Sequence, residues 1–161
     1  NGGMRLHHFI GTKLSPDHLS VGAVLLDARR KVYCHRARNV QKKTDLYFLM
    51  RETVRPGESL EKALARGLSE EFGIRAKLVR YLGSLVSEFT NWERARIRKT
   101  TLYFLCAPFG APRKKMMKEV HYGVASSPEW RSIPFLIRHM RRQSKVLRRT
   151  DFDESEILRR V

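Results

Sequence analysis

Short runs of alternating apolar and polar residues recur along the chain and predict several β-strands. The runs are separated by polar or turn-forming residues. Between the first two, the polar stretch Ala28-Arg29-Arg30-Lys31 indicates a hairpin. The strand candidates are residues 20–27, 32–38, 45–50, 78–89 and 100–109, followed by a short segment near Trp130.

A helical period replaces the strand period over residues 59–72. Pro56-Gly57 breaks the chain just before this segment, and Gly73 follows it, as a glycine commonly follows the end of a helix. A second, basic helix is expected at about residues 134–149. Strands before and after one central helix, with a second helix late in the chain, predict a mixed α+β fold or an α/β sandwich.

The chain of 161 residues is expected to form one domain, because it shows no linker, internal repeat or low-complexity tract. Its first four residues resemble a remnant of cloning, and residues 134–161 form a basic C-terminal helical segment. Cys34 and Cys106 lie in apolar runs without zinc-ligand spacing and are expected to be small buried side chains. No apolar run approaches the ~18 residues of a membrane span, so no membrane partner is expected.

One face of the central helix carries both apolar residues and an acid. On a helical wheel, Leu60, Leu64 and Leu68 form the apolar stripe, Glu71 falls within it, and Glu70 falls at its edge. A buried carboxylate without a partner costs several kcal/mol, so Glu71 is expected to meet a cation. From the residues alone, that cation is either an arginine or a divalent metal ion.

The segment 57–74, GESLEKALARGLSEEFGI, resembles the Nudix box. The box pattern is G-x5-E-x7-R-E-U-x-E-E-x-G-U, in which U is an apolar residue. The resemblance implies an α/β/α sandwich with a mixed sheet and the box helix packed on it. The matching residues are Glu58, Arg66, Leu68, Glu70, Glu71, Gly73 and Ile74.

The resemblance also implies chemistry. Nudix proteins cleave a nucleoside diphosphate linked to another group, between the phosphorus atoms, by metal-activated water. The resemblance implies Mg²⁺ or Mn²⁺ as the cofactor, and carboxylate oxygens suit both ions. The resemblance makes Glu58, Arg66, Glu70 and Glu71 the catalytic candidates. Glu70 and Glu71 would hold the metal, with a later acid, Glu129 or Glu119, as a further candidate ligand.

Two positions depart from the box. Its opening Gly, which supplies a backbone carbonyl to the metal in the family, is Glu52 here. The Glu that should follow Arg66, a metal ligand or general base in the family, is Gly67. Loss of a positioned base costs ~10² to 10⁴ in rate, so activity is expected to be slow or assisted. Gly67 either leaves room for a phosphate or a second chain, or reflects drift after catalysis was lost.

Charge favours a nucleic-acid partner. The chain has 33 Lys and Arg against 16 Asp and Glu, a net charge of +17, and RNA carries a phosphate at each nucleotide. Arg51 and Arg55 flank the box turn and are candidates for phosphate binding. The RNA-binding candidates are Trp92, Arg94, Arg96, Arg98, Lys99, Arg113, Lys114 and Lys115. The alternatives for these residues are an ordinary solvated face or a dock for an acidic partner.

Together these features predict a weak or partner-dependent pyrophosphohydrolase of RNA 5′-triphosphate ends, which would also bind nucleoside triphosphates. In its strong basicity and its missing box acid, the chain resembles the RNA 5′-end pyrophosphohydrolases of kinetoplastid mitochondria. That resemblance implies a mitochondrial location and other RNA-processing proteins as partners. The main alternative is a non-catalytic Nudix module that binds RNA or nucleotides in an RNA-processing or ribosomal assembly. A hydrolase of free nucleotides is a third possibility, which the charge disfavours.

Overall fold

A computed structural model describes most of the chain. Its strands form one large mixed sheet, with the order β6-β7-β2-β3-β9-β8. β1 and β5 pair with β2, and β4 pairs with β3. The described residues are 9–12, 15–39, 44–91, 93–113, 120–121 and 124–161. The strands are β1 (Phe9–Thr12), β2 (Ser15–Leu26), β3 (Lys31–Asn39), β4 (Thr44–Phe48), β5 (Met50–Thr53), β6 (Arg75–Thr90), β7 (Arg96–Phe109), β8 (Val120–His121) and β9 (Val124–Ser132).

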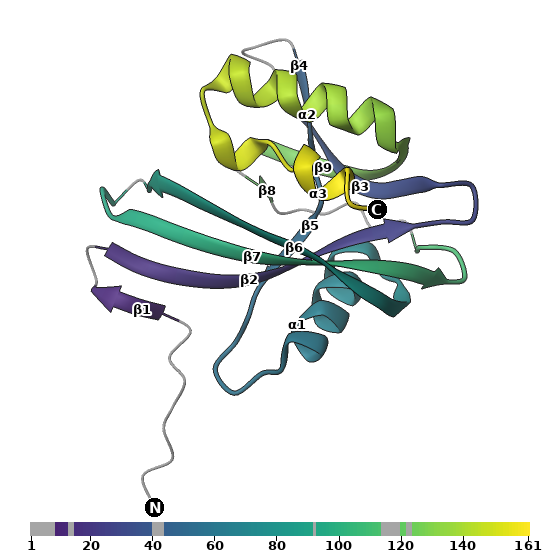
Figure 1. Ribbon diagram of the computed structural model, residues 1–161, viewed down its shortest axis with the longest axis horizontal. Helices are drawn as coiled ribbons and strands as arrows, with labels where there is room; N and C mark the ends of the chain where they lie inside the picture. Colours follow the sequence, from purple (N-terminus) through teal and green to yellow (C-terminus); the bar gives the residue numbers. More distant parts are fainter. Residues whose placement is uncertain (1–8, 13–14, 40–43, 92, 114–119, 122–123) are drawn as a thin grey trace, which may run out of the picture.

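Helices cover both faces of this sheet. The box helix α1 lies below it in Figure 1, whereas α2 and α3 lie above it. β2 and β7 pair in parallel, and each of the other described strand pairs is antiparallel. These layers confirm the predicted α/β/α sandwich. The helical segments are α1 (Leu60–Gly67), the π-helical turn η1 (Leu68–Phe72), α2 (Ile133–Leu147), the 3₁₀ turn η2 (Thr150–Phe152) and α3 (Ser155–Leu158).

Each face of the sheet has its own apolar core. Below the sheet, Leu64, Leu68 and Phe72 of the box segment pack against Val21 and Tyr33 of the strands. Above it, residues of α2 and α3 pack on the opposite side chains of the same strands, among them Leu136, Met140, Ile157 and Leu158. The two faces arise because successive strand residues point to opposite sides. In the described part of the chain, no helix has the length and apolarity needed to cross a membrane.

The box segment follows its sequence signals closely. The Ser59 side chain accepts a hydrogen bond from the Lys62 backbone N–H and caps α1. The helix then passes into the π-helical turn η1 and ends at Gly73, whose φ of 60° is a left-handed conformation. The predicted helix over 59–72 is therefore confirmed, although its last turn is wider than an α-helix.

The apolar run 45–50, expected as a single strand, is two strands. β4 pairs with β3, whereas β5 pairs with β2, and Leu49 lies at the bend between them. The Leu49 backbone N–H donates to Glu154 Oε1 at 2.9 Å instead of to a neighbouring strand. The polar partner that permits this bend therefore comes from a segment 105 positions later in the chain.

Candidate active site

Arg66 stands at the centre of the acidic residues of the box. Its Nε and Nη2 lie 2.9 and 3.0 Å from the two carboxylate oxygens of Glu58, and Nη2 also donates to the Thr53 carbonyl at 2.8 Å. Its Nη1 lies 3.0 Å from Glu52 Oε1 and 3.6 Å from Glu70 Oε2. One guanidinium thus joins the strand β5, the turn before α1 and the box helix.

Glu58 fastens the turn that precedes the helix. Its hydrogen bond from Arg66, and a second from the Arg55 backbone N–H, lower the pKa of its carboxyl to about 2. The same contact raises the pKa of Arg66. Both groups are therefore charged at neutral pH, and the two-pronged pair fixes the orientation of the guanidinium.

Glu71 points into the protein, as the helical wheel predicts. Only 5 % of its surface is exposed, and its Oε2 lies 2.6 Å from Nε2 of the fully buried His35 on β3. Burial lowers the pKa of His35 to about 4, so the imidazole is neutral at pH 7, and one hydrogen bond joins its Nε2 to the Glu71 carboxyl group. Phe72 packs on the same ring, with centroids 4.7 Å apart. A neutral imidazole is a partner that the sequence did not indicate.

Glu70 points the other way. Its side chain is 55 % exposed and approaches only the edge of the Arg66 guanidinium. Successive residues of a helix point about 100° apart, so these two adjacent acids face different sides, one toward solvent and one toward the core. Glu70 is consequently the accessible acid of the pair.

Gly67 lies at a close contact between α1 and β5. A Cβ atom added at Gly67 would lie 2.8 Å from Met50 Sδ and 2.9 Å from Glu52 Cβ, nearer than side chains normally approach. The idea that Gly67 leaves room for a phosphate or a second chain is therefore wrong, since the strand already fills that space. Glycine is needed here because it lets the helix and the strand approach each other.

Comparison with known proteins agrees with this geometry. Residues 16–145 match the family model of the NUDIX domain. The chain belongs to the Nudix family. No curated protein matches it significantly. Among solved structures, a MutT protein from Methanosarcina mazei Go1 is similar, with a TM-score of 0.56, 18 % identity, and coverage of 79 % of this chain and 85 % of that one. A MutT NUDIX hydrolase from Burkholderia pseudomallei has a TM-score of 0.52, 17 % identity, and coverage of 73 % and 84 % respectively.

Nudix hydrolases generally use Mg²⁺ or Mn²⁺, and the acids around Arg66 can be tested against that requirement. Within the described ranges, no group of three or more His, Cys, Asp or Glu side chains is placed to hold a metal ion. Mg²⁺, however, often uses only one or two carboxylates, because water and substrate phosphates complete its shell. Glu52 and Glu70 approach the same guanidinium nitrogen and fit such a site.

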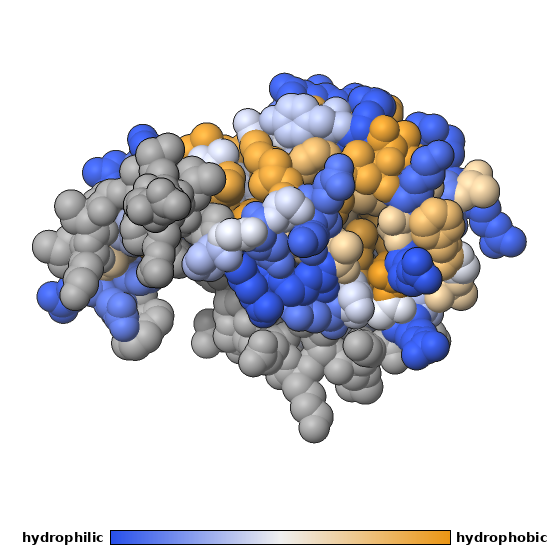
Figure 2. All heavy atoms as spheres, turned by 90° about the horizontal axis from the view of Figure 1, so that it is seen from below, coloured by the Kyte–Doolittle hydropathy of each residue, from blue (hydrophilic) through white to orange (hydrophobic). Residues whose placement is uncertain are grey.

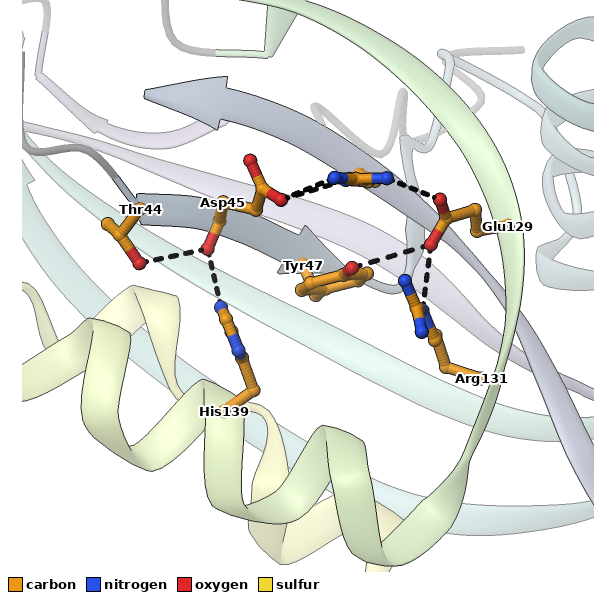
Figure 3. A network of polar contacts seen from close by, with 7 residues as sticks. Thr44, Asp45, Tyr47, Glu129, Arg131 and His139 are labelled. Carbon is orange, nitrogen blue, oxygen red and sulfur yellow. Dashed lines mark hydrogen bonds and ion pairs between the residues drawn. The ribbon is translucent and has the colours of Figure 1, made fainter. Parts of the chain in front are cut away.

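Glu129 does not belong to this site. It lies on β9 and points to the face covered by α2, where Arg36 and Arg131 each donate to its carboxylate at 2.7 Å (Figure 3). Burial alone would raise the pKa of Glu129, but the hydrogen bonds from the two arginines lower it. Because the box helix packs on the opposite face, the prediction that Glu129 is a metal ligand of this Nudix protein is wrong.

Arg51 and Arg55 differ in their surroundings. The Arg51 side chain is largely buried, with Nε 3.7 Å from Glu154 Oε2 and Nη1 donating to the Asp151 carbonyl at 3.4 Å. Arg51 thus contacts the C-terminal segment of the chain, and that contact occupies the group expected to bind phosphate. Arg55 is exposed beside the box turn, and phosphate binding there stays a prediction.

Four RNA-binding candidates follow the hairpin between β6 and β7. Arg94 is exposed at its turn, while Arg96 and Arg98 form exposed ion pairs with Glu88 and Asp17. Such pairs contribute little stability, so both guanidinium groups remain available to a phosphate. The next residue, Lys99, is half-buried; burial and the nearby Arg51 lower its pKa to about 8.

Arg113 lies at the other end of the box. It lines an open pocket of about 370 Å³ together with Ser69 and Arg75. RNA binding by these cations stays a prediction. Trp92, Lys114, Lys115 and the alternative acid Glu119 lie outside the described residues.

Sequence reasoning missed three residues of this region. His35 is a partner of Glu71, and its only signal was its position two residues from Tyr33 on the same strand face. Glu154 anchors the C-terminal segment from a stretch without a strong period. Glu52 was visible as a departure from the box, but its contact with Arg66 required the structure.

Proposed function

We propose that this Nudix protein hydrolyses the 5′-triphosphate end of RNA and releases pyrophosphate, slowly or with the help of a partner protein. The observation that carries the proposal is the convergence of Glu52, Glu58 and Glu70 on Arg66, with Glu70 open to solvent. Such a group suits a substrate that brings its own phosphates to a divalent cation.

The acids and the arginine would have separate tasks. Glu70, the accessible acid of the pair, would hold Mg²⁺, whereas Glu58 orients Arg66 and keeps its charge beside that acid. When bound, the cation neutralises phosphate charge and lowers the pKa of a water nucleophile. Since Gly67 provides no carboxylate for a general base, the proposed rate is low.

The charge of the chain supports RNA as the substrate. A net charge of +17 exceeds what a free nucleotide requires, and the exposed Arg94, Arg96 and Arg98 extend along one hairpin. Lys99 follows Arg98 on the same strand, β7. At pH 7 Lys99 remains mostly protonated and able to attract phosphate.

A protein partner is part of the proposal, as is a mitochondrial location, which rests on the resemblance to kinetoplastid RNA-processing proteins alone. β6 stands at one end of the sheet and exposes Leu78, Val79, Tyr81 and Val86. Exposed apolar residues on an edge strand favour pairing with another chain. The face on the α1 side also carries apolar patches between hydrophilic areas (Figure 2).

A specific observation favours the alternative, a Nudix module that binds RNA or nucleotides without cleaving them. Glu71 is buried on His35, which leaves Glu70 as the accessible acid of the pair. Under this alternative, the same basic hairpin would bind RNA while the box helix serves only the fold.

The experiment compares pyrophosphate release from 5′-triphosphorylated RNA, with Mg²⁺, by the unaltered protein, Glu70→Gln and Glu61→Gln. Glu61 is exposed on the same helix, so its substitution removes the same charge away from Arg66. We expect release by the unaltered protein and Glu61→Gln, and a loss of at least tenfold in Glu70→Gln. Salt-sensitive RNA binding without pyrophosphate release by any of the three would favour the binding module.

A further inference from the structure

Two positions of the box have exchanged residue types. The box pattern has Gly at the position of Glu52 and Glu at the position of Gly67, and this chain has the reverse. The two residues lie on different elements, β5 and α1, yet they meet in the fold. A Cβ atom built on Gly67 would lie 2.9 Å from Glu52 Cβ.

This contact has room for one side chain. Two Cβ carbons at 2.9 Å would overlap, because nonbonded carbons pack at about 3.5–4.0 Å. A Glu at position 67 therefore requires a residue without Cβ at position 52, and the reverse holds as well. The side chain of Glu52 begins close to the point from which a side chain of residue 67 would begin.

The carboxylate of Glu52 also reaches the acids of the box helix. Its Oε1 lies 3.0 Å from Arg66 Nη1, the atom that lies 3.6 Å from Glu70 Oε2. Glu52 is partly buried on a strand, so its position is better fixed than that of a side chain on a loop. The exchange thus keeps a carboxylate beside Glu70 and changes only the element that supplies it.

We propose that Glu52 provides, from β5, the carboxylate that the box helix lacks at Gly67, and that Glu52 and Glu70 together bind the divalent cation. The proposal rests on the proposed function for the use of this cation. It assigns a binding role to a residue that the box pattern leaves as glycine, and it explains Gly67 as the counterpart of Glu52.

Metal binding tests the proposal without reference to turnover. Mn²⁺ binding in the presence of pyrophosphate is measured by electron paramagnetic resonance for the unaltered protein, Glu52→Gln and Glu61→Gln. Glu52→Gln keeps the shape of the side chain and its packing on Gly67. We expect Mn²⁺ to bind the unaltered protein and Glu61→Gln alike, and Glu52→Gln at least tenfold more weakly. Equal binding by all three, or no binding by the unaltered protein, would overturn the proposal.

The reverse exchange gives a second test. Gly67→Glu alone places two Cβ atoms in the contact, whereas the double variant Glu52→Gly with Gly67→Glu places only one. The other close atom, Met50 Sδ, belongs to a flexible side chain that can turn away from the new Cβ. We expect the double variant to unfold at higher urea than Gly67→Glu and to bind Mn²⁺ at least tenfold more tightly than Glu52→Gly. A double variant that binds no better than Glu52→Gly would contradict the exchange.

The two proposals fail in different ways. If Glu52→Gln changes neither pyrophosphate release nor Mn²⁺ binding, the proposed function stands and the role of Glu52 is rejected. Mn²⁺ binding that depends on Glu52, without pyrophosphate release, would support the role of Glu52 and reject hydrolysis.

Discussion

Replacement of Glu154 by alanine should lower the free energy of unfolding by about 3–5 kcal/mol, the usual cost of breaking a buried ion pair from one side. Glu154 is 1 % exposed. It accepts a hydrogen bond from the Leu49 backbone N–H at 2.9 Å and another from the Tyr103 hydroxyl, and Arg51 Nε lies 3.7 Å from it. Alanine would leave all three groups without this acceptor inside the protein.

The size of this loss follows from burial more than from charge. A buried donor left without a partner costs about 1–3 kcal/mol, and the Leu49 N–H at the bend between β4 and β5 has no strand neighbour to replace Glu154. Glu154→Gln keeps an acceptor oxygen and the side-chain volume. Its cost should therefore fall below that of Glu154→Ala, which separates the hydrogen bonds from the ion pair.

Equilibrium unfolding in urea measures the effect. With a slope of about 2 kcal/mol per molar urea, the midpoint of Glu154→Ala should fall by about 2 M. Glu156→Ala is the control, because Glu156 lies on α3 just after Glu154, is exposed, and pairs with Arg159 only at 3.7 Å. Its midpoint should change little. A midpoint for Glu154→Ala equal to that of Glu156→Ala would refute the assigned role of the buried carboxylate.

Three further outcomes are expected. Arg66→Lys, which cannot form the two-pronged pair with Glu58, should lower the urea midpoint and weaken Mn²⁺ binding; unchanged values for both would contradict the central place of Arg66. The pKa of His35 is about 4 in the folded protein and 6.5 in the unfolded chain, so the unfolded chain takes up a proton first as the pH falls. The free energy of unfolding should therefore be unaffected by His35 above pH 6.5 and should fall by up to about 3 kcal/mol between pH 6.5 and 4. Urea titrations at pH 7.5, 5.5 and 4.5 check this, and a curve for His35→Gln as steep as that of the unaltered protein would reject it. Glu129→Gln should leave pyrophosphate release unchanged, because the Glu129 carboxylate lies on the face opposite the box helix. A tenfold loss of release would show that Glu129 belongs to the site after all.

Much of the fold could be predicted from local patterns. The Ser59 cap, the apolar stripe of α1 and Gly73 each act over a few residues, so the sequence shows them directly. The hairpin after residue 27 is also local: the Lys31 N–H donates to the Asp27 side chain at 2.8 Å across the turn. Such features depend on neighbours in the chain and not on the rest of the fold.

Other features depend on contacts between distant segments. The run 45–50 has uniform strand character, and its division at Leu49 follows from a hydrogen bond to Glu154 that no local pattern indicates. The sequence does not distinguish His35 from other strand residues, because its role follows only from its contact with Glu71. The inward direction of Glu71 could be predicted from the wheel, but its partner could not.

Glu129 shows the limit of assigning acids by their place after the box. Its position in the chain allowed a metal ligand, but strand alternation directs its side chain away from the box helix. Pairing of Cys34 with Glu129 across β3 and β9 sets that alternation, and the register of two antiparallel strands cannot be read from one sequence.

The dependence of Leu49 on Glu154 bears on how the protein is made. A ribosome releases the chain from its N-terminal side, so β4, β5 and the box helix emerge well before residues 150–158. Until those residues leave the exit tunnel, the bend at Leu49 and the guanidinium of Arg51 lack their buried acceptor. The nascent domain therefore lacks this contact between β4, β5 and Glu154 until residues 150–158 have been made.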